Sequence, residues 1–196
     1  MAEEKKLEQE YLPEEITEKD VKKSWLTYYF FAETGISYER LQALGFCMSL
    51  IPIFKKLYKK KEDFTAALKR HMVFYNTEAV FGSVINGITI AMEEQKAKGA
   101  PIDDETITSV KSGLMGPMAG VGDSLDWATF KPIIFALGAT LSAQGSPIGC
   151  FVLLLLPIIQ MIIGTNFAAF GYRKGRSSVR SILGSGKIQQ LLTAAS

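Results

Sequence analysis

Two carboxylates and a hydroxyl group at the end of a glycine-rich stretch are the side chains best suited to handle a polar solute. Asp123, Ser124 and Asp126 end a stretch that contains four glycines and a proline, namely Gly113, Gly116, Pro117, Gly120 and Gly122. Carboxylates and hydroxyls can accept hydrogen bonds from the hydroxyl groups of a sugar. A run without any acidic, basic or histidine residue then extends from 132 to 172. Carboxylates at membrane depth cost roughly 3 kcal/mol or more and are usually functional, so these acids mark a candidate site.

The glycine-rich stretch 113–124 is compatible with two structures. A phosphate-binding loop is excluded, because that motif needs a lysine where this chain has Val121 or Asp123 and because no strand precedes it. A simple interhelical turn and a re-entrant membrane element with irregular backbone beside a polar cavity both remain open. In a helix interior each glycine costs about 1 kcal/mol and proline about 3, so no regular helix is expected here. Asp123 and Asp126 would share a helix face and can pair with Lys111 or Lys131.

Other residues that could do chemistry give no sign of a catalytic or metal centre. His71 lies in an apolar stripe with helical spacing, whereas a catalytic or phosphate-carrying histidine needs access and an orienting partner. We therefore expect His71 to be a hydrogen-bonded interior residue. Cys47 and Cys150 form no metal or redox motif and are expected to be small buried side chains. No cofactor and no metal are predicted, and no nucleophile–base pair supports a soluble enzyme.

The uncharged region is long enough to cross a bilayer. The stretch 148–172 exceeds the roughly 20 residues that a membrane-spanning helix needs, and Gln144–Pro147 predicts a turn before it. All 20 acidic residues lie at or before Asp126, and the basic segment 173–180 follows the apolar stretch, which favours a cytosolic position for that segment. These bases lack interleaved aromatic residues, so a nucleic-acid partner is not expected.

The N-terminal half predicts amphipathic helices. Thr17–Asp20 has the spacing of a capping box and precedes a helix rich in aromatic residues and lysines, which suits the membrane–water boundary or the core of a soluble domain. Ser37 is a candidate N-cap for an apolar helix over 41–54, which is too short to span a membrane. The charged N-terminus has no signal peptide and should stay in the cytosol.

The predicted fold is an all-α integral membrane helical protein with amphipathic interfacial helices, a glycine-broken re-entrant element and at least one membrane-spanning helix. We divide it into a polar leader (1–16), an amphipathic arm (17–62) and a helical bundle segment (63–112). These are followed by a membrane core (113–172), which contains the glycine-rich break and a hydrophobic hairpin. The last part (173–196) is a cytoplasmic basic loop with the start of a further helix.

Several of these motifs together resemble one protein family. The segment Gly113–Ser124, with Trp127 and Lys131-Pro132 after it, closely resembles the signature of the IID component of mannose-family sugar phosphotransferase systems. Four further matches, at 17–20, 38–46, 74–77 and 171–172, occur in the same order along the chain. The resemblance extends over 17–196.

The resemblance implies a multi-pass subunit of a bacterial inner or plasma membrane that moves a hexose-type sugar together with a IIC permease subunit. Phosphoryl transfer would be carried by IIA and IIB partners, so the chain is expected not to be catalytic by itself and to work in a hetero-oligomer in contact with membrane lipid. Residues expected to line the sugar path are Asp123, Ser124, Asp126, Asn76, Glu78 and Gln144. Members usually continue beyond the position of Ser196 through at least one more membrane segment. The alternative hypothesis is a membrane assembly or scaffold protein without a transport path.

Overall fold

The computed structural model describes residues 12–185, and its regular elements there are all helical. The elements are α2 (Glu18–Phe31), α3 (Ala43–Leu57), α4 (Lys61–His71), α5 (Ser83–Ala97), α6 (Asp104–Gly122), the π-helical segment η1 (Asp123–Phe130), α7 (Lys131–Ala143) and α8 (Ile148–Ser185). This confirms the all-α class. The basic segment predicted as a loop from 173 is helical up to Ser185, because α8 continues through it, and the further helix predicted towards 196 lies outside the described residues.

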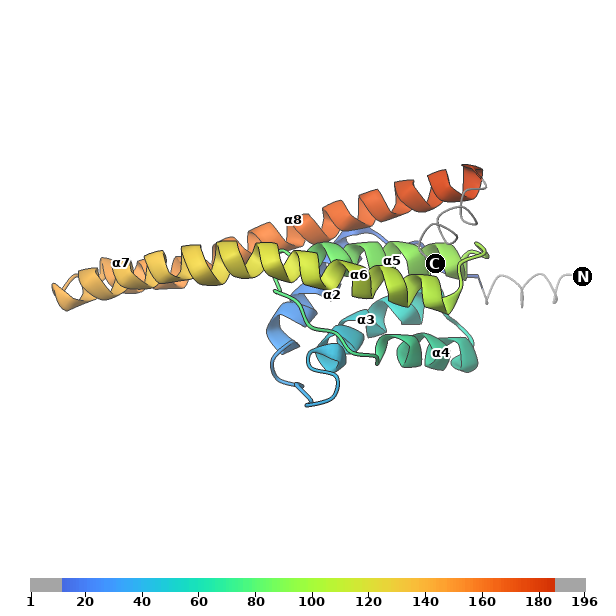
Figure 1. The fold of residues 1–196 in the computed structure, drawn as a ribbon, viewed down its shortest axis with the longest axis horizontal. Coiled ribbons are helices and arrows are strands. Elements are labelled where there is room, and N and C mark those ends of the chain that lie inside the picture. The colour runs from blue at the N-terminus through green and yellow to red at the C-terminus, as the bar shows by residue number, and fades with distance from the viewer. Residues whose placement is uncertain (1–11, 186–196) are drawn as a thin grey trace, which may run out of the picture.

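The helices form a bundle from which one long hairpin projects. Helices α2 to α5 pack together with the first part of α6 and the second part of α8. The continuous helical run α6–η1–α7 leaves the bundle, and α7 pairs with the first part of α8 to make the hairpin (Figure 1). The turn predicted at 144–147 connects the two arms of the hairpin at its far end, and Gly145 adopts a positive φ of 77° there. The core contains large side chains from the bundle, among them Trp25, Tyr28 and Phe46.

Helix α2 begins with the predicted capping box. The backbone N–H of Thr17 donates to Asp20 Oδ2 at 2.9 Å, and the backbone N–H of Asp20 donates to Thr17 Oγ1 at 3.3 Å. Helix α3, by contrast, is not capped by Ser37, so that prediction was wrong. Residues 37–41 form a local turn in which Ser37 and Leu41 exchange backbone hydrogen bonds, and α3 begins only after Gln42.

The glycine-rich stretch is helical, which corrects the expectation of a broken segment. Helix α6 runs through Pro117 to Gly122 and continues into η1 without an intervening turn. Its inward face buries Ile107 and Met115, while Gly113, Gly116 and Gly120 point outward into open space. In an apolar medium an unpaired backbone group costs several kcal/mol, more than the helix propensity lost at one glycine. A helix is therefore the favoured backbone state in spite of the glycines.

Glycines bring α5 and α8 into close contact. A Cβ atom at Gly87 would overlap the carbonyl oxygen of Ala168, and one at Gly171 would overlap the carbonyl oxygen of Val84. The absence of side chains at these two positions lets the two backbones touch, a packing mode common between membrane helices. Helix α8 is thereby fixed to the bundle along its second half.

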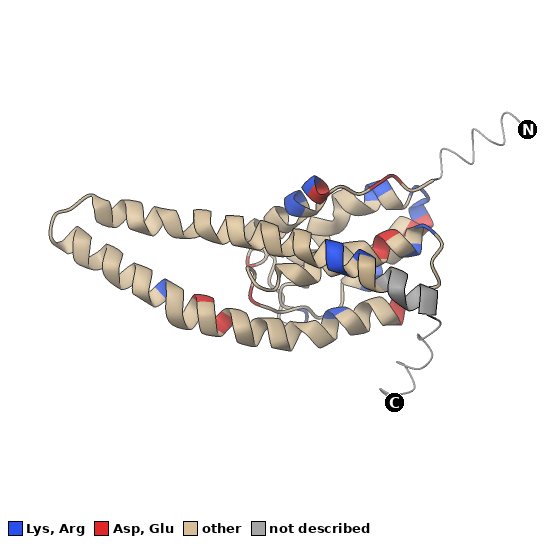
Figure 2. Cartoon of the chain, turned by 90° about the horizontal axis from the view of Figure 1, so that it is seen from above, with Lys and Arg blue, Asp and Glu red and all other residues tan. Residues whose placement is uncertain are grey.

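The hairpin exposes apolar surface, and the charged side chains gather at the bundle. The segment 148–178 of α8 is the one helical stretch within 12–185 that is long and apolar enough to cross a membrane. Exposed large apolar side chains cover both arms, including Ile133, Phe135, Phe151, Leu154 and Ile162. Figure 2 shows Lys, Arg, Asp and Glu concentrated on the bundle, with few on the hairpin. This distribution fits a hairpin surrounded by lipid.

Candidate functional site

A polar cavity lies where the hairpin joins the bundle. Its volume is about 270 Å³, and it is bounded by α2, the loop between α4 and α5, the end of α6, η1 and α8. The side chains that line it are mostly polar: Tyr29, Glu33, Gln42, Asn76, Thr77, Glu78, Asp123, Asp126, Lys131 and Gln160, together with Trp127 and four small or apolar residues, Ala32, Ala79, Val80 and Ala119. We call this the junction pocket.

Asp126 is the best-connected acid of the junction pocket. It is 4% exposed, and its Oδ2 atom lies 2.8 Å from the ammonium nitrogen of Lys131. Its Oδ1 atom accepts a hydrogen bond of 2.7 Å from the amide of Gln160, whose own oxygen accepts one of 2.9 Å from the hydroxyl of Tyr29. A chain of polar contacts thus joins α2, α8, η1 and α7.

Glu78 shapes the opposite wall of the pocket. Its carboxylate accepts backbone hydrogen bonds from Val80 at 2.9 Å and from Phe81 at 2.7 Å, which fixes the turn that leads into α5. Burial raises the pKa of Glu78, and the nearby charge of Asp126 acts in the same direction. Gly122 lies against this side chain, and a Cβ there would overlap the Glu78 carboxylate. The absence of a side chain at Gly122, the last glycine of the glycine-rich stretch, therefore leaves the space that the Glu78 side chain occupies.

The third wall is built by Gln42 at the start of α3. Its side-chain oxygen accepts hydrogen bonds from the hydroxyl of Tyr28 at 2.6 Å and from the backbone of Thr77 at 3.1 Å, and its amide donates to Glu33 at 2.8 Å. These contacts hold the 76–78 loop against α2. The pocket thus offers carboxylates, amides and a hydroxyl in one small volume, which is the chemistry that binds a polyhydroxylated solute.

Four of the six residues predicted from the sequence come together in the junction pocket, and two do not. Asp126, Glu78, Asn76 and Asp123 line it, although the last two are exposed. Ser124 instead bonds back along its helix, with its hydroxyl 2.8 Å from the carbonyl oxygen of Gly120. Gln144 belongs to the turn at the far end of the hairpin.

Sequence reasoning missed Tyr29, Gln42 and Gln160. Tyr29 belongs to a run of aromatic residues, and Gln160 is an uncharged residue in an apolar helix. Neither Tyr29 nor Gln160 is therefore marked as a site residue by its neighbours in the sequence. The two are 131 positions apart, and only the packing of α2 on α8 brings them together. An amide within an otherwise apolar membrane helix was the one available hint, since polar groups there usually face the interior of the protein.

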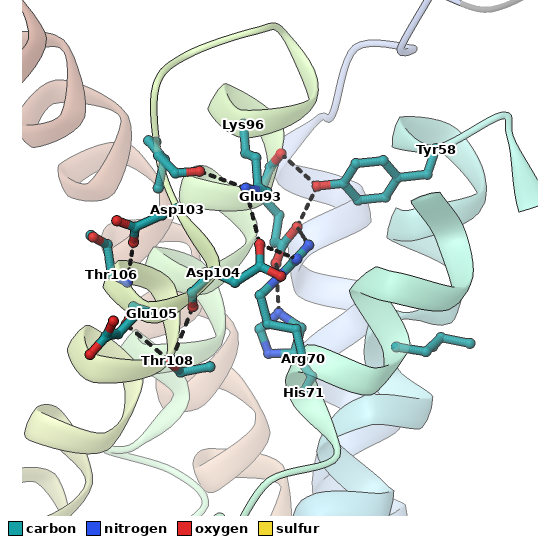
Figure 3. A network of polar contacts seen from close by, with 12 residues as sticks. Tyr58, Arg70, His71, Glu93, Lys96, Asp103, Asp104, Glu105, Thr106 and Thr108 are labelled. Carbon is teal, nitrogen blue, oxygen red and sulfur yellow. Dashed lines mark hydrogen bonds and ion pairs between the residues drawn. The ribbon is translucent and has the colours of Figure 1, made fainter. Parts of the chain in front are cut away.

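A second polar cluster, centred on Glu93, joins α4, α5 and α6 (Figure 3). Its carboxylate lies 2.7 and 2.9 Å from two guanidinium nitrogens of Arg70 and 2.7 Å from His71 Nε2. Asp104 completes it by pairing with Arg70 at 2.6 Å and with Lys96 at 3.0 Å. Burial alone would raise the pKa of Glu93, but His71 and Arg70 outweigh it and hold that pKa at about 2.

The cluster confirms the prediction for His71. Its ring is fully buried, and burial lowers its pKa in spite of the Glu93 carboxylate beside it. A ring without solvent access and fixed by a carboxylate has a packing and hydrogen-bonding role.

Lys111 does not pair with Asp126. Its ammonium group is buried at 1% exposure over the rings of Phe46 and Tyr75, 5.3 and 5.6 Å from their centroids, and burial lowers its pKa to about 8. Cys47 is buried as expected, but Cys150 is exposed on the apolar surface of the hairpin, so the prediction of a buried side chain was wrong there.

The chain matches one family model over most of its length. Residues 15–196 match the model described as "PTS system mannose/fructose/sorbose family IID component". The curated protein named the sorbose-specific EIID component of the phosphotransferase system of Lacticaseibacillus casei is 42% identical over 183 residues, covering 93% of this chain and 64% of that protein. The mannose-specific EIID component of Escherichia coli K12 is 39% identical, covering 92% of this chain and 64% of its own length.

A solved structure shares the fold. The cryo-EM structure of the mannose transporter ManYZ in complex with microcin E492 contains a chain that superposes with a TM-score of 0.83 at 38% sequence identity, covering 93% of this chain and 66% of that one. The present chain thus spans about two thirds of the length of the relatives that it matches.

Proposed function

Because the chain belongs to the mannose/fructose/sorbose family of phosphotransferase IID components, we propose that it is a membrane subunit that moves a hexose-type sugar into a bacterial cell. It does so together with a IIC permease subunit, and uptake is coupled to phosphorylation of the sugar by IIA and IIB partners. The relatives carry the names of sorbose-specific and mannose-specific components, which supports a hexose as the transported molecule.

The observation that carries the proposal is the junction pocket at the base of an apolar hairpin. Asp126 is almost fully buried there at the edge of the uncharged region; one oxygen accepts a hydrogen bond from Gln160, and the other lies 2.8 Å from the Lys131 ammonium nitrogen in an ion pair. Hydrogen bonds that involve a charged group contribute about 1.5–3 kcal/mol, so one such acid can account for much of the affinity for a sugar. The sugar path runs past Asp126 and Glu78, with Asn76 and Asp123 at its more exposed edge.

The chain itself is not the phosphoryl carrier. The one histidine of the sequence is His71, and its ring is buried and bonded to Glu93. A phosphate carrier would need an accessible ring nitrogen. The phosphorylated histidines therefore belong to the IIA and IIB partners.

The charge distribution supports an orientation in the membrane. The bundle carries most of the charged side chains, and Arg173, Lys174 and Arg176 follow the apolar part of α8 directly. Basic residues at the end of a membrane helix favour the cytoplasmic side. We accordingly place the bundle and the N-terminus on the cytoplasmic side, in a multi-pass subunit.

Uptake of radiolabelled mannose, fructose and sorbose by cells that express the chain with its IIA, IIB and IIC partners tests the proposal. Asp126→Asn should lower uptake at least about tenfold with normal amounts of the complex in the membrane, since it removes a charged hydrogen-bond acceptor. Glu105→Gln is the matched control, because Glu105 is an exposed acid at the start of α6. Full uptake by Asp126→Asn would remove Asp126 from the path. Unchanged uptake after deletion of the whole chain would favour the scaffold hypothesis.

A further inference from the structure

The ion pair between Asp126 and Lys131 joins two residues that an ordinary α-helix would not bring together. Their charged atoms lie 2.8 Å apart although the residues are five positions apart. With 3.6 residues per turn, side chains five apart point about 140° away from each other, and pairs form at spacings of three or four. The local geometry of η1 must therefore account for the contact.

The π-helical turn of η1 supplies that geometry. The backbone N–H of Lys131 donates to the carbonyl oxygen of Asp126, and the hydroxyl of Thr129 donates to the carbonyl oxygen of Ser124 at 2.8 Å, both across five residues. Such a wider turn places residue i+5 above residue i. It thereby stacks the lysine above the aspartate.

Pro132 lies directly after the π turn, whereas Pro117 in α6 and Pro157 in α8 lie within ordinary α-helix. Proline has no N–H to donate, and in an α-helix its ring would clash with the carbonyl group four residues earlier, which here belongs to Ala128. A π turn relieves that clash without a break in the helix. Lys131 therefore lies between the widened turn and Pro132.

Lys131 also balances the charge of the junction pocket. Of the described residues that line the pocket, four are acids, Glu33, Glu78, Asp123 and Asp126, and Lys131 is the one base. Its side chain is 16% exposed, and its ammonium nitrogen lies 3.3 Å from the ring centroid of Trp127. Removing one member of a buried ion pair leaves an uncompensated charge, which is strongly unfavourable.

We infer that Lys131 is the positioning residue of Asp126, holding its carboxylate across the π turn so that it faces Gln160 and the cavity. The inference rests on the proposed function of the junction pocket. The lysine contacts one carboxylate oxygen, and Gln160 contacts the other. The acid is therefore held from two sides in the orientation that a sugar hydroxyl would meet.

Fluorine NMR of the tryptophans tests the contact without any transport measurement. The chain has two tryptophans, Trp25 and Trp127, so 5-fluorotryptophan adds two resonances from this chain to the spectrum of its complex with the IIC partner; Trp25→Phe and Trp127→Phe assign one each. We expect Lys131→Met to shift the Trp127 resonance and to leave the Trp25 resonance in place. Lys174→Met is the matched control, since Lys174 is an exposed lysine 5.8 Å from the Phe170 ring centroid.

Uptake by single and double variants then tests positioning. Lys131→Met should raise the half-saturating sugar concentration about tenfold with an unchanged amount of complex, and Lys131→Arg should recover most of that loss. Because the two residues act as one unit, uptake by the double variant Asp126→Asn with Lys131→Met should be no lower than uptake by the poorer single variant. That uptake should be at least about fivefold higher than the value obtained by multiplying the two single losses. The double variant leaves neither charge unpaired, so it keeps the test open if Lys131→Met fails to fold.

Two results would overturn the inference. One is a Trp127 resonance that Lys131→Met does not move, and the other is a double variant whose loss equals the product of the single losses. A Trp127 resonance that responds to both Asp126→Asn and Lys131→Met while uptake stays at the wild-type level would support the ion pair and refute the function proposed for the pocket. The two proposals thus fail in different ways.

Discussion

Replacing Lys111 by methionine is expected to stabilise the protein, because it removes a buried ammonium group without leaving a cavity. Within residues 12–185 the Lys111 amine has no hydrogen-bond partner. Burial lowers its pKa from 10.5 to about 8. At 1.36 kcal/mol for each pKa unit, that difference corresponds to about 3 kcal/mol of unfavourable free energy at pH 7. The lost contacts with Phe46 and Tyr75 offset about 0.5–2 kcal/mol, so a net stabilisation of about 1–3 kcal/mol is expected.

The pH dependence of stability gives the same prediction an independent check. Between pH 8 and 10.5 the unfolded lysine still binds a proton that the folded lysine has lost, so the free energy of unfolding of the native chain rises with pH in this window. Below pH 8 the full unfavourable term is present. Lys111→Met should abolish the rise, since its side chain does not titrate.

Thermal and denaturant unfolding of the complex in detergent, from pH 6 to pH 10.5, measures both effects. Lys69→Met is the matched control: Lys69 is exposed on α4, and the same chemical change there should alter stability by no more than about 0.5 kcal/mol. A Lys111→Met variant that is less stable than the native chain at pH 7, with an unchanged pH dependence, would refute the reasoning. It would mean that the amine is held by a favourable interaction.

Four further substitutions test other parts of the structure. Gly87→Ala should destabilise the protein by about 2 kcal/mol or more, because its Cβ would overlap the carbonyl oxygen of Ala168. In the same melting experiment Gly113→Ala should be neutral or stabilise by up to about 1 kcal/mol, because its Cβ would meet open space. Glu93→Gln should destabilise by about 3 kcal/mol at pH 7, because the buried guanidinium of Arg70 loses its buried carboxylate partner and keeps only the exposed Asp104. In the native chain the Glu93 contribution is present above about pH 4.5 and is lost as pH falls towards 2, so acid titration of the variant should lack that step. Thr17→Ala should cost about 1 kcal/mol, read from the same melts, through loss of the cap of α2.

Local features of the fold could be predicted from the sequence because they depend on neighbouring residues. The capping box at Thr17 needs only a hydroxyl and a carboxylate three positions apart, and both predicted hydrogen bonds are present. The turn at 144–147 and the long apolar helix after it follow from glycine, proline and an uncharged run in the same way. The helix propensities of glycine and proline misled at 113–124, because those values describe helices in water.

The junction pocket could be predicted only in part, because its two halves come from distant parts of the chain. Asp126 could be recognised as an acid at the edge of an apolar run, and Lys131 as one of two lysines that could pair with it. The contact of Asp126 with Gln160 depends on the pairing of α7 with α8 in the hairpin, and no local pattern encodes it. The π turn was also beyond a sequence argument, since a single proline permits a kink, a helix end or a widened turn.

The unbroken length of α8 sets how deep the pocket lies within a bilayer. With 38 residues the helix is about 57 Å long, nearly twice the hydrocarbon thickness of about 30 Å, so a large part of it must extend beyond the lipid tails. Gln160 is twelve residues from Ile148, which is about 18 Å along the axis. A hairpin whose tip reaches the far headgroups therefore holds Asp126 just beyond the midplane. Under the proposed function, a sugar that reaches the junction pocket from the hairpin tip has passed more than half of the hydrocarbon thickness.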